Sequence, residues 1–498
     1  MGILTQQKFE PFGFLIVLAS VAAAAVISVV APATMPWSFV VLVAAALLVY
    51  WVARWDVVVL TWLWVGSYGT LDWDPLKVII PGFFTMSPPR FIFVAAVLAY
   101  LLYFLLRRGL IRFDLKLLWL ILAVVLYYGW SAHTTGWTAR VYEYRAAPYY
   151  RYISAMVLPF IMLWLVYSAT RRERQIAWPL VLVSIYGWYA LYLGYLQYIW
   201  AGGGGADWAR ALIWPSYVTD PEFGIHLERG RGAFRTAVGQ SVFLVMLFYM
   251  NLYSIRRIRG PYRTILILQA VLTIPAIFFT GIRAGYVAFL VCGVVWCLWG
   301  SSYRVAGLKI AVGLLVLIVG VVVFWENLAT TERRTGGVAQ LGPIRSREVL
   351  VRQAQEIVRA YPWRGVGFGH FIDHQVQMAR DPQNLSGMSA FMLSQHNVFL
   401  TLVCETGVPG LVGIVAIFVG VFWQSLCLRR KLPPTAAGWL SRDFVVLFWI
   451  IMLNFIVAGM FTDMLWEVPS CAMLWSMAGL VVGYNRLLDP HPIELPSA

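Results

Sequence analysis

Long runs of apolar residues, separated by short polar segments, recur along most of the chain. A run of about 20 apolar residues is long enough to cross the hydrocarbon core of a bilayer as a helix. Backbone polar groups inside a membrane must be bonded within their own segment, so such runs predict α-helices. The runs lie near residues 11–31, 36–54, 55–71, 90–107, 115–131, 153–169, 176–200, 236–254, 263–280, 284–300, 306–325, 408–427, 444–461 and 467–485. We therefore expect an all-α, polytopic membrane protein with about 14 spans.

The composition of the chain agrees with this class of protein. Its 498 residues are 61% hydrophobic and only 12% charged, and that charged fraction is about half the fraction found in a soluble domain. The cysteines form neither a CxxC pair nor a loop framework, so we predict neither disulfides nor a thiolate metal site. The first apolar run follows Lys8 and Glu10 without a convincing cleavage site, which favours a retained span over a signal peptide.

The net charge of +15 is explained by orientation in the membrane. Basic residues concentrate in short loops, and we find no basic patch interleaved with aromatic residues that would predict a nucleic-acid partner. The four basic loops fall on alternate connections, so they share one side, which the positive-inside rule makes cytoplasmic. These loops are RRGLIRFDLK (107–116), RRERQ (171–175), RRIRGPYR (256–263) and RRKLPP (429–434). Both termini are then cytoplasmic, and loops 72–89, 132–152, 201–235, 326–407 and 462–466 face outward.

The outward loop 326–407 is too long to be a simple connector, since structureless loops of this length are uncommon. Within it, Leu350, Ala354, Ile357, Val358 and Tyr361 recur at helical spacing and predict one apolar helix face. The opposite face carries Arg345, Glu348, Arg352, Glu356 and Arg359. We expect this amphipathic helix to lie along the membrane surface or over the bundle. A second short helix is predicted to begin near His396 and to stop at Gly407 and Pro409.

Three groups of arginines are predicted to face outward. Arg229, Arg231 and Arg235 precede the span at 236, Arg283 stands in a tight turn, and Arg345 and Arg347 open the amphipathic helix. Guanidinium groups match phosphate oxygens bidentately, so several on one side favour an anionic ligand. The alternative is that they cap helices, contact lipid headgroups or pair with the acidic residues Glu222, Glu228 and Glu348.

His396 is a candidate for proton transfer because a histidine of ordinary pKa can accept a proton from a hydroxyl at neutral pH. A purely structural histidine is the alternative. Two weaker patterns suggest metals. His370 and His374, with Asp373 between them, have zinc-ligand spacing, although the preceding GVGFG favours a loop there. Asp72 and Asp74 form a DWD pattern that would suit a divalent cation.

These segments resemble the O-antigen ligase and O-antigen polymerase superfamily of bacterial envelope glycosyltransferases. RGRGAF matches an RxxGxF motif through Arg229, Gly232 and Phe234, and FTGIRAG matches a turn that ends at Arg283, with Ile282 where serine is usual. Residues 345–371 match an arginine-led helix followed by GVGxGxF, with Val351 where tryptophan is usual. SQHNVFLTLVCETGVPG matches an HNxxL…ExGxxG signature that includes His396, Asn397 and Glu405. The resemblance covers roughly residues 227–420.

The resemblance implies an undecaprenyl-diphosphate-linked glycan as donor, a sugar hydroxyl as acceptor, and neither a cofactor nor a metal. His396 would be catalytic, Arg229, Arg231, Arg283 and Arg347 would bind the diphosphate, and Arg235, Arg345, Asn397 and Glu405 would support them. The site would face the periplasm from the bacterial inner membrane. Three regions follow: a bundle (1–325) with the arginine-rich loop 201–235, a periplasmic catalytic loop (326–407) and C-terminal spans (408–498).

Two roles remain open within this chemistry. A polymerase joins repeat units on lipid carriers and can work with a chain-length regulator, whereas a ligase transfers finished glycan to lipid A core. About 14 spans favour the polymerase slightly. A third alternative, a transporter of lipid-linked sugars, is less favoured because the sequence has no internal repeat and its charge gathers outside the membrane rather than at mid-depth.

Overall fold

The chain folds into a bundle of long apolar helices. The computed structural model describes residues 57–70, 78–80, 84–86, 88–106, 115–138, 148–202, 206–214, 216–219, 229–234, 236–299, 342–379, 396–434 and 438–489. The α-helices are α3 (Val57–Thr70), α4 (Pro88–Leu106), α5 (Lys116–Thr135), α6 (Pro148–Arg151), α7 (Leu158–Ala169), α8 (Arg174–Gln197), α9 (Asp207–Leu212), α10 (Ala237–Ile255), α11 (Pro261–Phe279), α12 (Arg283–Trp299), α15 (Gly342–Ala360), α16 (Phe371–Ala379), α17 (Val398–Lys431), α18 (Arg442–Gly459) and α19 (Val468–Leu487).

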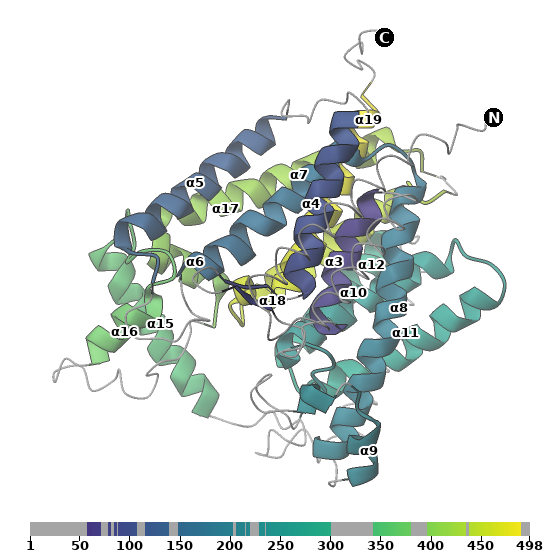
Figure 1. The fold of residues 1–498 in the computed structure, drawn as a ribbon, viewed down its shortest axis with the longest axis horizontal. Helices are drawn as coiled ribbons and strands as arrows, with labels where there is room; N and C mark the ends of the chain where they lie inside the picture. Colours follow the sequence, from purple (N-terminus) through teal and green to yellow (C-terminus); the bar gives the residue numbers. More distant parts are fainter. Residues whose placement is uncertain are drawn as a thin grey trace.

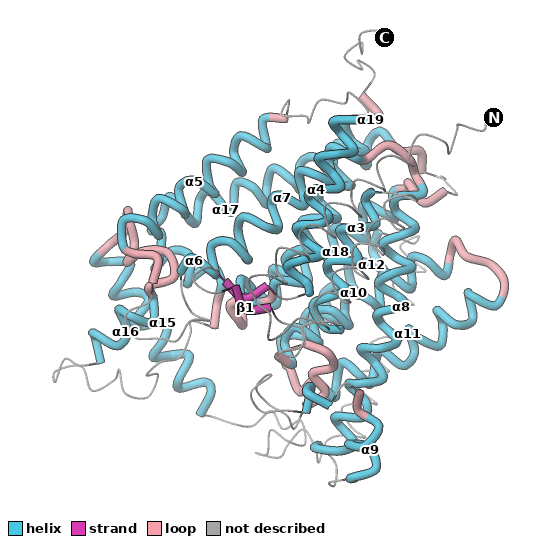
Figure 2. Tube along the Cα trace, in the orientation of Figure 1, coloured by secondary structure: helices cyan, strands magenta, loops and turns pink. Residues whose placement is uncertain are grey.

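Short irregular elements join these helices. The π-helices η5 (Tyr152–Val157) and η6 (Tyr198–Gly202) continue α6 and α8, and the 3-10 helices are η7 (Ser216–Thr219) and η10 (Met464–Trp466). Strands β1 (Val78–Ile80) and β2 (Phe84–Met86) pair antiparallel, with Val78 opposite Met86, and form the small hairpin drawn in magenta in Figure 2. This hairpin is an addition to the all-α fold that the sequence predicts.

Seven helices in the described part of the chain are long and apolar enough to cross a membrane: Lys116–Thr135, Pro148–Ala169, Arg174–Ala201, Ala237–Ile255, Pro261–Phe279, Val398–Lys431 and Arg442–Gly459. Val58–Ser67, Pro89–Leu101 and Arg283–Trp299 are shorter apolar helices. The predicted spans at 11–31, 36–54 and 306–325 lie outside the described residues. The all-α, multi-pass architecture is confirmed.

Helix α19 lies in the core and packs against α7, α17 and α18. Two glycines permit its close approach to α7. A Cβ atom at Gly479 would stand 2.6 Å from the carbonyl oxygen of Leu163, and one at Gly483 would stand 2.6 Å from the Cβ of Thr170. Small residues four positions apart allow two helix backbones to meet in a membrane protein, where van der Waals packing drives association.

Three of the predicted basic loops gather at one end of the bundle. Glu173 accepts a hydrogen bond from the backbone N–H of Leu440 (2.9 Å), and Arg257 donates to the Gly438 carbonyl (3.1 Å). Lys431 donates to the carbonyl of Asn485 (2.7 Å), next to Tyr484, whose hydroxyl donates to the carbonyl of Arg172 (2.8 Å). Helices α9, α15 and α16 lie away from this end (Figure 1). The parity of the spans therefore placed these loops together correctly.

The amphipathic helix is confirmed as α15, which packs over the bundle. Leu350, Ala354 and Ile357 form a small apolar core with Phe371 of α16 and Cys404 of α17. The opposite face is exposed, and Arg352 pairs there with Glu348 at 2.6 Å. The prediction was wrong for Tyr361, because α15 ends at Ala360 and leaves this side chain 47% exposed.

Candidate active site

His396 stands immediately before a short helix that occupies residues 398–406 within α17. Asn397 has an extended backbone, and its side-chain oxygen accepts hydrogen bonds from the N–H groups of Phe399 (2.9 Å) and Leu400 (3.0 Å). This is an N-cap, which satisfies donors that the first helical turn leaves without partners. The Asn397 amide also donates to the carbonyl of Met460 (3.2 Å). Asn397 thus fixes the backbone beside His396, whose side chain is partly buried.

Gly407 separates the short helix from the rest of α17. Its φ of 69° lies in the left-handed region that other residues rarely adopt. A Cβ atom there would stand 2.5 Å from the backbone carbon of Trp363, so a side chain has no room. The kink is reinforced by the hydrogen bond from the N–H of Val408 to the carbonyl of Pro362 (2.8 Å). The predicted stop at Gly407 is therefore a kink, after which α17 continues to Lys431.

The segment GVGFG (365–369) forms a loop, called here the glycine turn, which caps the end of the short helix. The N–H of Val366 donates to the carbonyl of Cys404 (2.8 Å), and the N–H of Gly367 donates to that of Glu405 (2.9 Å). The last carbonyls of a helix have no partners within it, so these bonds satisfy them. Gly365 has a φ of 63°, and a Cβ atom there would overlap the backbone carbon of Glu405. The glycines thus allow backbone to meet backbone.

A buried charge cluster lies under the end of the short helix. Arg151, at the end of α6, pairs with Glu405 at 2.5 Å and with Asp463 at 2.6 Å, and all three side chains are almost fully buried. We call these three residues the ionic triad. The sequence resemblance singled out only Glu405. Arg151 could have been suspected because an arginine close to a long apolar run needs an acidic partner when it is buried.

The hairpin 460–463, between α18 and η10, contacts two segments that carry predicted site residues. Met460 accepts the hydrogen bond from Asn397 described above, and the guanidinium of Arg347 lies 6.0 Å from the ring centre of Phe461. Arg347 is exposed on the first part of α15. The structure therefore brings the neighbourhood of His396 and Arg347 to the same hairpin.

A second group of arginines surrounds the turn between α11 and α12. The N–H of Gly230 donates to the carbonyl of Phe279 (2.9 Å), which docks the segment 229–234 onto the end of α11. The Arg229 side chain runs beside Gly281, where a Cβ atom would stand 3.4 Å from its Cδ. Arg283 follows Gly281 by two positions and is the first residue of α12. Arg229 and Arg283 therefore border the same turn, although they are 54 positions apart.

The other predicted arginines are placed differently. Arg231 is fully buried and donates to the carbonyl of Val218 (2.5 Å), a bond that attaches the 229–234 segment to η7. Arg345 lies in the first turns of α15, where its side chain is not described, and Arg235 lies outside the described residues. The diphosphate-binding role of Arg231 and the supporting roles of Arg235 and Arg345 stay predictions.

The start of α10 connects the two parts of the site. Thr236 caps α10 through a hydrogen bond from the N–H of Gly239 (3.0 Å), and its hydroxyl donates to Glu467, directly before α19. The first turns of α10 also meet the start of α12, since a Cβ atom at Gly285 would overlap the Oγ of Ser241. The turn between α11 and α12, called here the arginine turn, and the segment 460–467 thus adjoin the same end of α10.

The histidines that suggested zinc have other partners. His370 contacts the carboxylate of Asp373 through Nδ1 (2.8 Å) and the carbonyl of Gly136 through Nε2 (2.8 Å). The ring of His374 packs against that of Tyr361. Among the residues that the structure describes, no group of three or more His, Cys, Asp or Glu side chains could hold a metal. Asp72 and Asp74 lie outside those residues.

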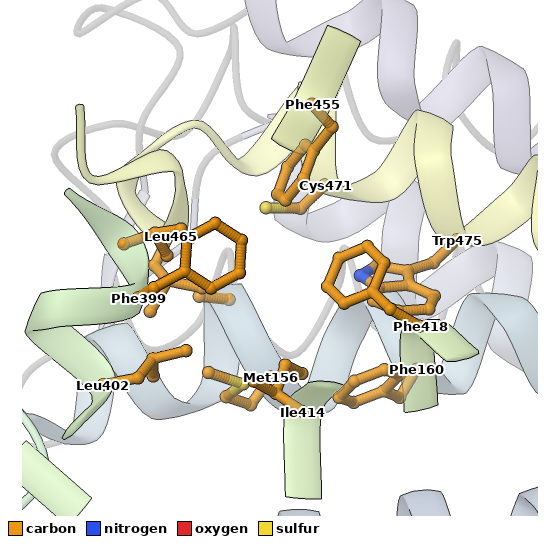
Figure 3. A pocket seen from close by; sticks show the side chains of 12 residues that line it. Met156, Phe160, Phe399, Leu402, Ile414, Phe418, Phe455, Leu465, Cys471 and Trp475 are labelled. Atoms are coloured by element: carbon orange, nitrogen blue, oxygen red, sulfur yellow. The ribbon is translucent and has the colours of Figure 1, made fainter. Parts of the chain in front are cut away.

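An apolar pocket lies beside the short helix. Figure 3 shows Phe399 and Leu402, from the short helix, facing Met156 from η5 and Leu465 from η10. The remaining lining residues are Ala155, Phe160, Val398, Ile414, Phe418, Phe455, Cys471 and Trp475. The helix that follows His396 therefore rests on apolar side chains that leave a gap between them.

Comparison with known proteins agrees with the resemblance seen in the sequence. Residues 268–415 match the family described as O-antigen ligase. The matched range includes the arginine turn, α15, the glycine turn, His396 and the kink, but not the segment 229–234. No curated protein matches the sequence. Over residues 268–415 the chain is therefore similar to the O-antigen ligase family, and its multi-pass helical fold agrees with that similarity.

Proposed function

We propose that the protein transfers an undecaprenyl-diphosphate-linked glycan to a sugar hydroxyl, and that it acts as an O-antigen or exopolysaccharide repeat-unit polymerase. The observation that carries this proposal is the arrangement at one end of the bundle. There, His396 precedes a helix that is capped at both ends. The segment 460–467 contacts Asn397 at one point and the start of α10 at another. The start of α10 in turn packs against α12, next to the turn that carries Arg229 and Arg283. Proton transfer and charge stabilisation are the two tasks that a displacement of diphosphate requires.

In this mechanism His396 accepts the proton of the acceptor hydroxyl while the oxygen of that hydroxyl bonds to the anomeric carbon of the donor. The bond from that carbon to the diphosphate oxygen breaks, and the electron pair leaves with undecaprenyl diphosphate. Arg229, Arg283 and Arg347 stabilise the negative charge that develops on this leaving group. Attack opposite the leaving group inverts the anomeric configuration, and the proposed reaction uses no metal.

The test is reconstitution of the purified protein in liposomes with an undecaprenyl-diphosphate-linked repeat unit, with and without lipid A core. Growth of the glycan from donor alone identifies a polymerase. Transfer that requires the core identifies the alternative, an O-antigen ligase. Loss of activity on chelation would contradict metal independence.

Two variants test the residue roles in the same assay. His396→Ala should lower the rate by roughly 10²- to 10⁴-fold, the contribution typical of a general base, while binding of the donor persists. Arg283→Ala should weaken donor binding, and normal binding would exclude its diphosphate role. Asp443→Asn is the control, because it removes only the ion pairs of Asp443 with Arg256 and Arg257, at the basic end of the bundle.

A further inference from the structure

The ionic triad joins three elements that are far apart in the sequence. Arg151 closes α6, Glu405 lies in the last turn of the short helix, and Asp463 follows α18. The guanidinium of Arg151 also lies 5.2 Å from the ring centre of Phe368, within the glycine turn. Burying charges is unfavourable unless they are paired and hydrogen-bonded. A shift of any of the three elements that broke these pairs would therefore be unfavourable.

The triad is the second of two connections between the short helix and the hairpin 460–463. At the start of that helix, Asn397 bonds to Met460, and at its end Glu405 is joined through Arg151 to Asp463. The hairpin 460–463 is thus attached near both ends of the short helix. Asp463 is itself fixed, because its second oxygen accepts a hydrogen bond from the N–H of Leu465 (3.2 Å).

Two kinds of contact hold the short helix: apolar contacts at the pocket and the ion pairs of the triad. They do not fix the rotation and the position of this helix equally well. The apolar side of this helix faces the pocket in Figure 3, where Phe399 and Leu402 meet Met156 across a gap. Apolar contact is non-directional, so it tolerates rotation or sliding. Planar guanidinium–carboxylate bonds are directional. Moreover, Arg151 directly precedes the π-helix η5, an element found frequently at functional sites.

We propose that Arg151 is a positioning residue, which holds the short helix in the register that sets His396 against the acceptor hydroxyl. It acts through Glu405 and Asp463 and does not itself touch the substrate. This inference rests on the proposed function, and it adds a role that the sequence resemblance does not assign. Misplacement of a reacting group by about 1 Å can lower a rate on the order of 100-fold.

The test replaces the whole triad, because removing Arg151 alone would leave two buried carboxylates. The triple variant Arg151→Met, Glu405→Gln and Asp463→Asn removes all three charges of the triad together, so none of its members keeps a charge that has lost its partner in the triad. The asparagine introduced in place of Asp463 can still accept the hydrogen bond from the N–H of Leu465. We expect a folded protein whose KM for the donor is nearly unchanged and whose kcat falls on the order of 10- to 100-fold. Arg151→Lys keeps the charge but loses the planar guanidinium that reaches both carboxylates, so it should give an intermediate kcat.

Hydrogen exchange of residues 396–406 gives a readout that does not depend on catalysis. Exchange should be faster in the triple variant and in Arg151→Lys than in the unmodified protein, and unchanged in the Asp443→Asn control. Normal kcat in the triple variant would overturn the proposal, as would unchanged exchange in Arg151→Lys if the triple variant does not fold. If the unmodified protein transfers no glycan, the proposed function fails, while exchange still decides whether the triad holds the helix.

Discussion

At the scale of single residues, Asn397 shows how local chemistry prepares the site. Its side-chain oxygen caps the short helix and its side-chain nitrogen donates to Met460, so both polar atoms of the amide group have partners. The sequence places Asn397 beside His396, and the structure gives a reason for that pairing. The cap fixes the backbone from which the histidine projects.

Replacing Asn397 separates these two contacts. Asn397→Ala should lower the free energy of unfolding by about 1 kcal/mol, as expected for loss of an N-cap, and should slow glycan transfer. Asn397→Ser keeps a good cap and loses only the donor to Met460, so its thermal stability should stay closer to that of the unmodified protein. Apparent melting temperatures in detergent measure this difference, and equal losses in both variants would contradict the capping role.

His374 gives a pH-dependent prediction outside the spans. Burial lowers its pKa below the usual value of a histidine, so the folded protein resists protonation there. The unfolded chain takes up that proton as the pH falls through about 6.5, and His374 therefore reduces stability below that pH. Between about pH 7.5 and about pH 5.5, His374→Gln should lose less thermal stability than the unmodified protein.

A second non-titrating variant controls for lost packing in this experiment. His374→Phe keeps a ring against Tyr361 and should show the same reduced sensitivity to acid as His374→Gln. If both variants lose as much thermal stability as the unmodified protein over this pH range, protonation of His374 does not contribute to the acid sensitivity.

At the scale of elements, the short helix is defined by what closes its two ends. Asn397 caps its start, and the glycine turn satisfies the carbonyls at its end. A helix of nine residues is marginal by itself, so it depends on these contacts and on the ionic triad.

The kink at Gly407 should not tolerate a side chain. Gly407→Ala combines an unfavourable positive φ, which costs about 1–3 kcal/mol, with a clash against the backbone of Trp363. We expect reduced thermal stability and slower transfer. Gly66→Ala is the matched control, because a Cβ atom there would meet no atom of the described residues within 4 Å, and its melting temperature should not fall. A stable, fully active Gly407→Ala protein would contradict the proposed importance of the kink.

At the scale of the whole molecule, the bundle separates a basic end from the end that carries the candidate site. Glu173, Arg257 and Lys431 lie at the basic end and bond across loops, including Lys431 with Asp489 at 3.1 Å. We propose that this end is cytoplasmic, in keeping with the positive-inside rule. The glycine turn and α15 then face the periplasm.

Labelling of introduced cysteines tests this orientation. Trp363, beside the glycine turn, is 70% exposed, and Tyr262, at the basic end, is 69% exposed. With a membrane-impermeant maleimide on intact spheroplasts, Trp363→Cys should react, whereas Tyr262→Cys should react only after the membrane is opened. The unmodified chain provides the background, since its own cysteines are buried or partly buried. The reverse pattern would invert the topology and exclude a periplasmic site.

The sequence by itself determined the class of fold, the amphipathic face of α15, the loop at GVGFG and the segments that carry the family signature. These features depend on hydrophobic periodicity and on local backbone preferences, which are written in neighbouring residues. Only the tertiary structure decided that Arg151, Glu405 and Asp463 meet, that Arg229 lies beside the turn of Arg283, and that Arg231 is buried against Val218. Those contacts join residues up to 312 positions apart, and they depend on how the helices pack, which no local pattern of residues specifies.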